Sequence, residues 1–228
     1  MNTKTPSPPS GSSSFAELVR QRRATAHFLP DEVPEADITQ AFLTAAEAPS
    51  GFNTQPWRFL TLRNEANRVA LRKAAYDQEK ITEAPLVIVA YGLKEGWEEP
   101  LVRIQQEKAR RLGMDGSAAE RLAKSASDFV HKMNMAVWLN RHVMIAFTYL
   151  MLAFEDLGWD TAPMEGFDPQ KVKEAFSLPA DVEVIALLAV GRTKDNTQKH
   201  PGRQALDQFV SDEAAGKPWH GKKAAAGA

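Results

Sequence analysis

The sequence predicts an α+β domain in which helices surround a small sheet, and three observations support this class. Segments with helical periodicity cover far more of the chain than strand-like segments do. No Gly-x-Gly-x-x-Gly motif follows a strand, which argues against a Rossmann dinucleotide domain. The chain has 228 residues, 43% of them hydrophobic, which is enough for one sizeable domain with a real core.

The helices and strands are predicted from hydrophobic periodicity, from residues that begin or end such elements, and from composition. Helices are expected at residues 15–23, 35–48, 64–75, about 98–112, about 117–128, 133–157 and 168–176. Strands are expected at 59–63, 86–91 and 183–191. Gly158 is a natural stop for the helix at 133–157, because glycine readily adopts the left-handed conformation that ends helices.

The helix at 133–157 is apolar on nearly every face, so it must be buried on more than one side. It contains too many polar residues, among them Asn140, Arg141 and Glu155, for a membrane-spanning helix. Burial of this kind is difficult within one small domain. A homodimer core is therefore the better explanation.

Composition excludes several classes of function. The formal net charge is −1, so no strong field attracts nucleic acid or an anionic membrane. The absence of cysteine removes disulfides and thiolate sites and fits a reducing, cytoplasmic compartment. None of the five histidines has a carboxylate at metal-binding spacing in the sequence, so no metal site is expected. No Gly-rich loop followed by Lys suggests nucleotide triphosphate chemistry.

The two ends of the chain read as tails. Residues 1–14 are rich in Ser and Pro and lack an apolar stretch, so a disordered tail and no secretory signal are expected. Residues 211–228 read as a flexible C-terminal tail, which leaves residues 15–210 as the single domain.

The segment from Pro49 to Phe59 concentrates polar groups between a helix and a strand. Ser50, Gly51, Asn53 and Gln55 bring a hydroxyl, two amides and exposed backbone into six residues, with a proline on either side. Amide side chains offer donor and acceptor edges that suit a planar ring with alternating N–H and C=O groups. A capped turn without a ligand explains the loop about equally well.

A basic cluster precedes this loop. Arg20, Arg22 and Arg23 lie at the end of the first helix, and guanidinium groups match phosphate oxygens in pairs. Arginines near a helix C-terminus also stabilise the helix dipole, so the cluster alone does not establish a phosphate site.

Taken together, these segments resemble the FMN-dependent nitroreductase family. The chain has the family's basic pair, small residue and Phe at 22–28, and its Pro-Ser-Ser-x-Asn-x-Gln-Pro-Trp block at 49–57, with Gly51 replacing the second Ser. Further resemblances lie at 76–85, at the Pro-Met-Glu-Gly-Phe block of 158–168, at 189–192 and in the basic segment 199–203. The resemblance covers residues 15 to 210.

The resemblance implies a nitroreductase-like fold with a mainly antiparallel central sheet, arranged as an intertwined homodimer with FMN at the interface. The cofactor-binding positions that it carries over are Arg22, Arg23, Thr25, Ser50, Gly51, Asn53, Gln55, Gln78, Lys80, Pro163, Met164, Glu165, Gly166, Lys199 and Arg203. By position, the basic residues would bind the FMN phosphate, Lys80 would lie near flavin N1, and the backbone of Glu165 and Gly166 would contact flavin N5.

The implied activity is ping-pong hydride transfer from NADH or NADPH to small electrophilic acceptors such as nitroaromatics or quinones. No dedicated catalytic acid or base is implied, because the flavin transfers the hydride. Ala24 and Ala26 stand where the family often has polar residues, which would weaken contacts at that corner. The alternative is a flavin-binding or flavin-storage protein of the same fold with little turnover.

Overall fold

The computed structural model describes residues 14–194 and 199–219. The chain divides into two compact units, one ending at Asn196 and the other starting at Thr197. The predicted tail at 1–14 falls outside the described residues except for Ser14. Ser14 caps the first helix, because its side chain accepts a hydrogen bond from the backbone N–H of Glu17.

The first unit is built around a five-stranded sheet in which every strand pair is antiparallel. The strands are β1 (Phe28–Leu29), β2 (Trp57–Leu62), β3 (Leu86–Leu93), β4 (Asp160–Met164) and β5 (Val182–Thr193). The order is β1-β5-β3-β2, and β4 also pairs with β5. This confirms the α+β class and the antiparallel sheet.

Both faces of the two central strands are buried, so their sequences are continuously apolar and do not alternate with polar residues. In β3, Ile88 and Ala90 face one core cluster, whereas Val87 and Val89 face the other. The register against β5 shifts at Ala90, and there Ile185 and Ala186 both join the first cluster. A bulge inserts one extra residue, so two successive side chains share a face.

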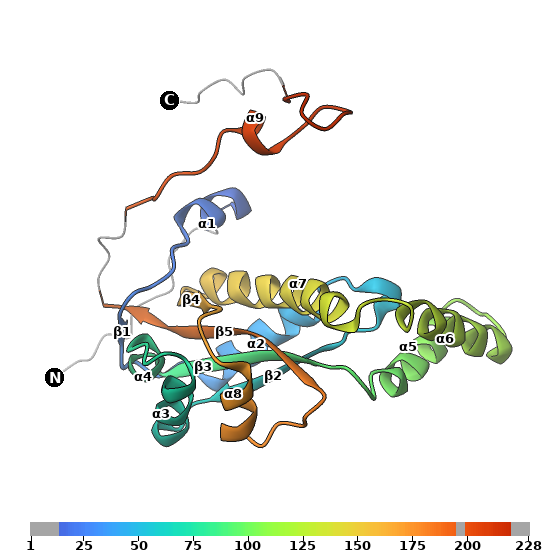
Figure 1. The fold of residues 1–228 in the computed structure, drawn as a ribbon, viewed down its shortest axis with the longest axis horizontal. Helices are drawn as coiled ribbons and strands as arrows, with labels where there is room; N and C mark the ends of the chain where they lie inside the picture. Colours follow the sequence, from blue (N-terminus) through green and yellow to red (C-terminus); the bar gives the residue numbers. More distant parts are fainter. Residues whose placement is uncertain (1–13, 195–198, 220–228) are drawn as a thin grey trace. The chain divides into compact units, whose positions relative to one another are not determined.

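Helices cover the two faces of this sheet (Figure 1). In chain order, the first unit contains α1 (Phe15–Gln21), α2 (Glu35–Ala46), the 3₁₀ turn η1 (Gly51–Asn53), α3 (Glu65–Ala74), α4 (Lys80–Glu83), α5 (Glu98–Arg111), α6 (Gly116–Val130), α7 (Met135–Asp156) and α8 (Pro169–Ala175). Helices α2 and α7 pack together on one face, and α3 and α8 contact each other on the other side.

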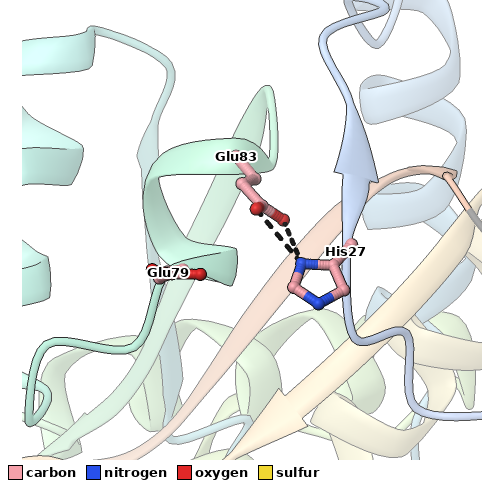
Figure 2. A group of neighbouring side chains, drawn as sticks. All are labelled: His27, Glu79 and Glu83. Atoms are coloured by element: carbon pink, nitrogen blue, oxygen red, sulfur yellow. Dashed lines mark hydrogen bonds and ion pairs between the residues drawn. The ribbon is translucent and has the colours of Figure 1, made fainter.

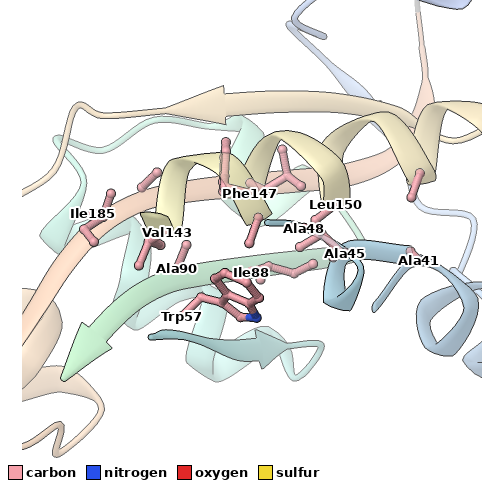
Figure 3. Packing of buried hydrophobic residues seen from close by; sticks show 14 of the residues in the cluster. Ala41, Ala45, Ala48, Trp57, Ile88, Ala90, Val143, Phe147, Leu150 and Ile185 are labelled. Carbon is pink, nitrogen blue, oxygen red and sulfur yellow. The ribbon is translucent and has the colours of Figure 1, made fainter. Parts of the chain in front are cut away.

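Helix α7 contacts α2 and four of the strands, which makes it the central helix of the larger core cluster. Figure 3 shows the small side chain of Ala45 from α2 beside Leu150 of α7, and Phe147 of α7 above Ile88 of β3. Alanine at the contact lets two helices approach closely. Each buried Phe or Leu of this kind contributes about 1.5–3 kcal/mol to stability.

By length and hydropathy α7 could cross a membrane, as the one such helix among the described residues. Its packing against α2 and the sheet is instead that of a core helix. Part of its surface stays uncovered within one chain, because Val137, Ile145 and Tyr149 remain at least 36% exposed. The prediction that this helix is buried on several sides is therefore confirmed in part by the single chain.

The sequence located every long element within two residues of its observed ends and missed the short ones. Strand β1 has two residues and α4 has four, too few for a periodic signal. Strand β4 was missed because Pro163 argues against a strand. The structure accommodates this proline with an exposed side chain in a strand that pairs with β5.

The second unit is small and largely exposed. It contains α9 (Leu206–Phe209) and an antiparallel bridge between Ser211 and Pro218. The unit boundary near residue 196 differs from the expected boundary at 210. The division into a domain at 15–210 and a tail at 211–228 stays a prediction.

Candidate flavin site

The basic pair expected to bind phosphate lies beside β4. Ala24 forms a parallel bridge with Thr161, and the backbone N–H of Thr25 donates to the carbonyl oxygen of Thr161 at 2.9 Å. Nη1 of Arg22 and Nε of Arg23 are buried and have no hydrogen-bond partner. A buried guanidinium N–H without an acceptor is costly, and a phosphate oxygen would remove that cost.

Glu155, which the sequence motifs do not include, contacts Thr161 next to the basic pair. Glu155, near the end of α7, accepts hydrogen bonds from the backbone N–H and the hydroxyl of Thr161 at 3.1 and 2.6 Å. Burial raises the pKa of Glu155 to about 7, although the Thr161 hydroxyl opposes this and the charge of Asp160 adds to it. Arg22 lies close enough to lower the same pKa slightly.

The expected contacts around flavin N5 assemble at the other end of β4. Nε2 of Gln78 donates to the carbonyl oxygen of Gly166 at 2.8 Å, although 88 residues separate them. A Cβ on Gly166 would come within 3.4 Å of that amide nitrogen, so Gly166 and Gln78 are closely packed. Lys80 begins α4 two residues further on, half-buried and without an ion pair among the described residues. Arg22, Arg23, Gln78, Lys80, Glu165 and Gly166 are called the β4 group below.

The polar loop at residues 50–55 has an unusual backbone. Phe52, Asn53 and Gln55 have φ values of 56°, 56° and 46°. A left-handed conformation is tolerable for Asn and costly for a bulky residue such as Phe. Internal hydrogen bonds hold it, because the Ser50 hydroxyl accepts from the Gln55 N–H at 3.0 Å and the Asn53 side chain accepts from the Gln55 amide at 3.2 Å.

Side chains from helices α5, α6 and α7 contact this loop. Gln105 of α5 is 3% exposed, and its amide donates to the carbonyl oxygen of Phe52 at 2.7 Å. Phe129 of α6 packs edge-on against the Phe52 ring. His142 of α7 lies under the loop, so that a Cβ on Gly51 would come within 3.1 Å of its Nε2. The sequence could not reveal these contacts, because each joins the loop to a residue more than 50 positions away.

Strained backbone is concentrated in the two predicted regions. Of the seven non-glycine residues with positive φ in the described part of the chain, three lie in the 50–55 loop and two, Tyr76 and Asp77, directly precede Gln78. Such conformations persist only where the surrounding structure imposes them, and they are common at ligand sites. No residue pattern in these two regions indicates positive φ values at Phe52, Gln55 or Tyr76.

Arg22 lies near the C-terminal end of α7, whereas the 50–55 loop packs nearer the N-terminal end. The loop lies near His142, and Arg22 and Thr161 adjoin Glu155, thirteen residues further along the helix. At 1.5 Å per residue, this corresponds to about 20 Å along the helix axis. Within one chain, therefore, the structure brings Gln78 to Gly166 and connects Ser50, Asn53 and Gln55 to one another, whereas the basic pair lies apart from the 50–55 loop.

The other residues that the sequence predicted for the site lie in β4, next to it, or in the second unit. Pro163 is exposed and Met164 is buried, both within β4, and Thr25 is 3% exposed. Lys199 and Arg203 belong to the second unit, where Nη1 of Arg203 donates to the carbonyl oxygen of Gly202. Trp57 is buried in the core.

A histidine and two glutamates form a separate group at the edge of the β4 group. Nδ1 of His27 lies 3.1 Å from both carboxylate oxygens of Glu83 (Figure 2). The Glu83 carboxylate also accepts from the backbone N–H of Phe28. The donor atoms of His27, Glu79 and Glu83 lie within 4.8 Å of one another. His27 and Glu79 are exposed, and the contacts connect β1 to α4 as an ion pair would. That no metal is bound stays a prediction.

Comparison with known proteins decides the family. Residues 19–192 match the profile of the nitroreductase family. The chain belongs to the nitroreductase family. This member is 32% identical over 174 residues to the NADH dehydrogenase of Thermus thermophilus, a match that spans 75% of this chain and 82% of that protein.

Solved structures agree with the fold. A nitroreductase-like protein of Streptococcus mutans superposes with a TM-score of 0.77 at 25% identity, covering 87% of this chain and 97% of the other. A protein of Exiguobacterium sibiricum, solved in complex with FMN, superposes with a TM-score of 0.79 at 23% identity, covering 88% and 98%. These structures confirm the nitroreductase-like fold. The family match and its NAD(P)H nitroreductase relatives confirm that the chain is an NAD(P)H-dependent oxidoreductase of this family.

Proposed function

We propose that this nitroreductase-family oxidoreductase binds FMN and transfers hydride from NADH or NADPH to nitroaromatic or quinone acceptors. The single observation that most supports it is the pair of buried, unpartnered guanidinium nitrogens on Arg22 and Arg23. They provide cationic donors where a phosphate would bind, and the FMN complex of the Exiguobacterium protein shows that the fold can hold this cofactor.

The residues fit FMN in their chemistry. Arg22 and Arg23 would hold the phosphate. That Lys199 and Arg203 also bind it stays a prediction from the family resemblance. When bound, FMN supplies the hydride chemistry, which no side chain of the protein can provide. Lys80 would stabilise negative charge on the pyrimidine side, since no ion pair among the described residues neutralises it.

The remaining contacts would orient the flavin ring. The amide of Gln78 fixes the Gly166 carbonyl and thereby the backbone that would face N5. Asn53 and Gln55 would bond the ring or ribityl oxygens from a loop held rigid by Gln105. Prearranged donors cost little reorganisation when the reaction occurs.

The active protein would be a homodimer with FMN between the two chains. The α7 residues that adjoin the 50–55 loop and Arg22 are about 20 Å apart along the helix, so the loop and the basic pair would reach one FMN more readily from two different chains. A second copy related by a twofold axis would bring the 50–55 loop of one chain to the β4 group of the other. Exposed apolar residues such as Phe15 of α1, 72% exposed, and Tyr149 of α7 would be covered in that contact.

The visible spectrum of the purified protein tests the proposal, followed by anaerobic addition of NADH or NADPH. Flavin bands that bleach and then recover on addition of a quinone or nitroaromatic are expected. Bands that fail to bleach would indicate a flavin-binding protein without turnover. A colourless protein that does not bind added FMN would refute the proposal.

A further inference from the structure

A cavity of about 780 Å³ opens between the 50–55 loop and helix α5. Asn53 and Gln55 line one side of it, and the other side is formed by α5. The charged residues of α5 that face the cavity are Arg103, Glu107, Lys108 and Arg111. Three cations therefore face one carboxylate beside the two amide side chains that we assign to the flavin.

The carboxylate is fully engaged on its own helix. Oε1 of Glu107 accepts from Arg111 at 2.6 Å and from Arg110 at 2.7 Å, and Oε2 accepts from Arg110 at 2.8 Å. These two guanidinium groups lower the pKa of Glu107 to about 2, so the group stays ionised and paired. Among the described residues, no ion pair involves Arg103 or Lys108. Their charges are free to meet an anion.

The position of these cations is fixed relative to the loop. The buried amide of Gln105 connects α5 to Phe52, and Ile104, between Arg103 and Gln105, lines the cavity with its apolar side chain. Arg103 and Lys108 thus belong to a helix that is connected to the 50–55 loop by a hydrogen bond.

We infer that Arg103 and Lys108 form a subsite for an anionic group on the substrate that lies against the flavin. This rests on the proposed function. The ligand is an aromatic or nicotinamide compound with a phosphate, carboxylate or sulfonate on the side remote from the reacting atom. Cationic side chains recognise all three groups in the same way. The anion comes either from the electron donor, as the phosphates of NADH or NADPH, or from a charged acceptor.

The test compares Arg103→Gln/Lys108→Gln with Lys73→Gln/Lys171→Gln. The second variant removes the same charge from exposed positions on α3 and α8, outside the cavity. Initial rates are measured with NADH and NADPH as donors and with naphthoquinone and naphthoquinone sulfonate as acceptors. In ping-pong kinetics, kcat/KM for donor and for acceptor are obtained separately, so the two sources of the anion are distinguished.

The cavity variant is expected to lose about tenfold in kcat/KM for the charged substrate, with kcat and the neutral quinone unchanged. A loss with the sulfonate alone assigns the subsite to the acceptor, a loss with both donors assigns it to the donor phosphates, and a loss with NADPH alone assigns it to the 2′-phosphate. High salt should reduce each loss, because it screens exposed charges. Equal kcat/KM in the two variants for all four compounds would overturn the inference.

A wild-type protein without turnover would refute the proposed function and not the subsite. Calorimetric titration with NADPH and with naphthoquinone sulfonate then gives the answer directly. Weaker binding of either compound to the cavity variant than to the control variant supports the subsite, and equal binding to both refutes it.

Discussion

Replacing Glu155 with glutamine should stabilise the protein at alkaline pH and leave its stability nearly unchanged at acidic pH. The carboxyl group is largely buried against Thr161, and burial raises its pKa from 4.5 to about 7. The folded chain therefore keeps a proton that the unfolded chain releases between these pH values. The stability that this group contributes is fully present below pH 4.5 and is lost as the pH rises through about 7.

The magnitude follows from the shift. For a pKa of 4.5 unfolded and about 7 folded, linkage gives a loss of about 2.5 kcal/mol between about pH 5 and pH 8 in the wild type. Glutamine cannot ionise, and its side-chain oxygen can still accept from the Thr161 N–H. The difference in stability between variant and wild type should therefore grow by about that amount over the same range.

Urea unfolding at several pH values measures this difference, with FMN held at one saturating concentration because a ligand adds its own stabilisation. Glu120→Gln on α6, an exposed glutamate without a hydrogen bond among those the structure describes, is the matched control and should show no such trend. A Glu155→Gln curve parallel to the wild type at every pH would show that Glu155 has an ordinary pKa. The account of its burial would then be wrong.

Three further predictions concern the site. Arg203→Ala should reduce the fraction of protein that retains flavin and leave the unfolding midpoint of the flavin-free form unchanged. The control Lys171→Ala should change neither the flavin content nor the midpoint. Full flavin content in Arg203→Ala would show that Arg203 does not bind the phosphate. Gln105→Met should leave the Phe52 carbonyl unpaired, lower the free energy of unfolding in urea by about 1–3 kcal/mol and raise the KM for acceptors. If neither value changes, the loop keeps its conformation without Gln105. Co-expression of an inactive Arg23→Ala chain with an inactive Asn53→Ala chain should restore about a quarter of wild-type activity, because half of the dimers are mixed and each of these has one intact shared site; no recovery would place the whole site within one chain.

The long elements could be predicted because their signals are local. The alanines of α2 and the continuous apolar run of β3 are readable from neighbouring residues alone. Gly158 ends the long helix as expected, with a φ of 81°. Short elements such as α4 depend on what they pack against, and a window of four residues contains no period.

The candidate site could be predicted in its residue types and not in its arrangement. The motifs named Asn53, Gln78 and Gly166, but only the structure shows that Gln78 holds Gly166. Prolines on both sides suggested a fixed loop, yet nothing in the sequence indicated a left-handed Phe52. The Glu155 contact was missed because a glutamate at the end of an apolar helix looks like solvent-exposed surface.

The separation of Arg22 from the 50–55 loop along α7 also bears on how such a protein would lose its cofactor. In the proposed dimer, a flavin held between two chains would leave more easily when the chains part, so its release rate would depend on subunit exchange. Dilution would then cause loss of flavin as well as dissociation, and the yellow colour would fade at low protein concentration. In the proposed dimer, the length of α7 would set the spacing between Arg22 and the 50–55 loop, and thereby the geometry that a second chain must match to complete the site.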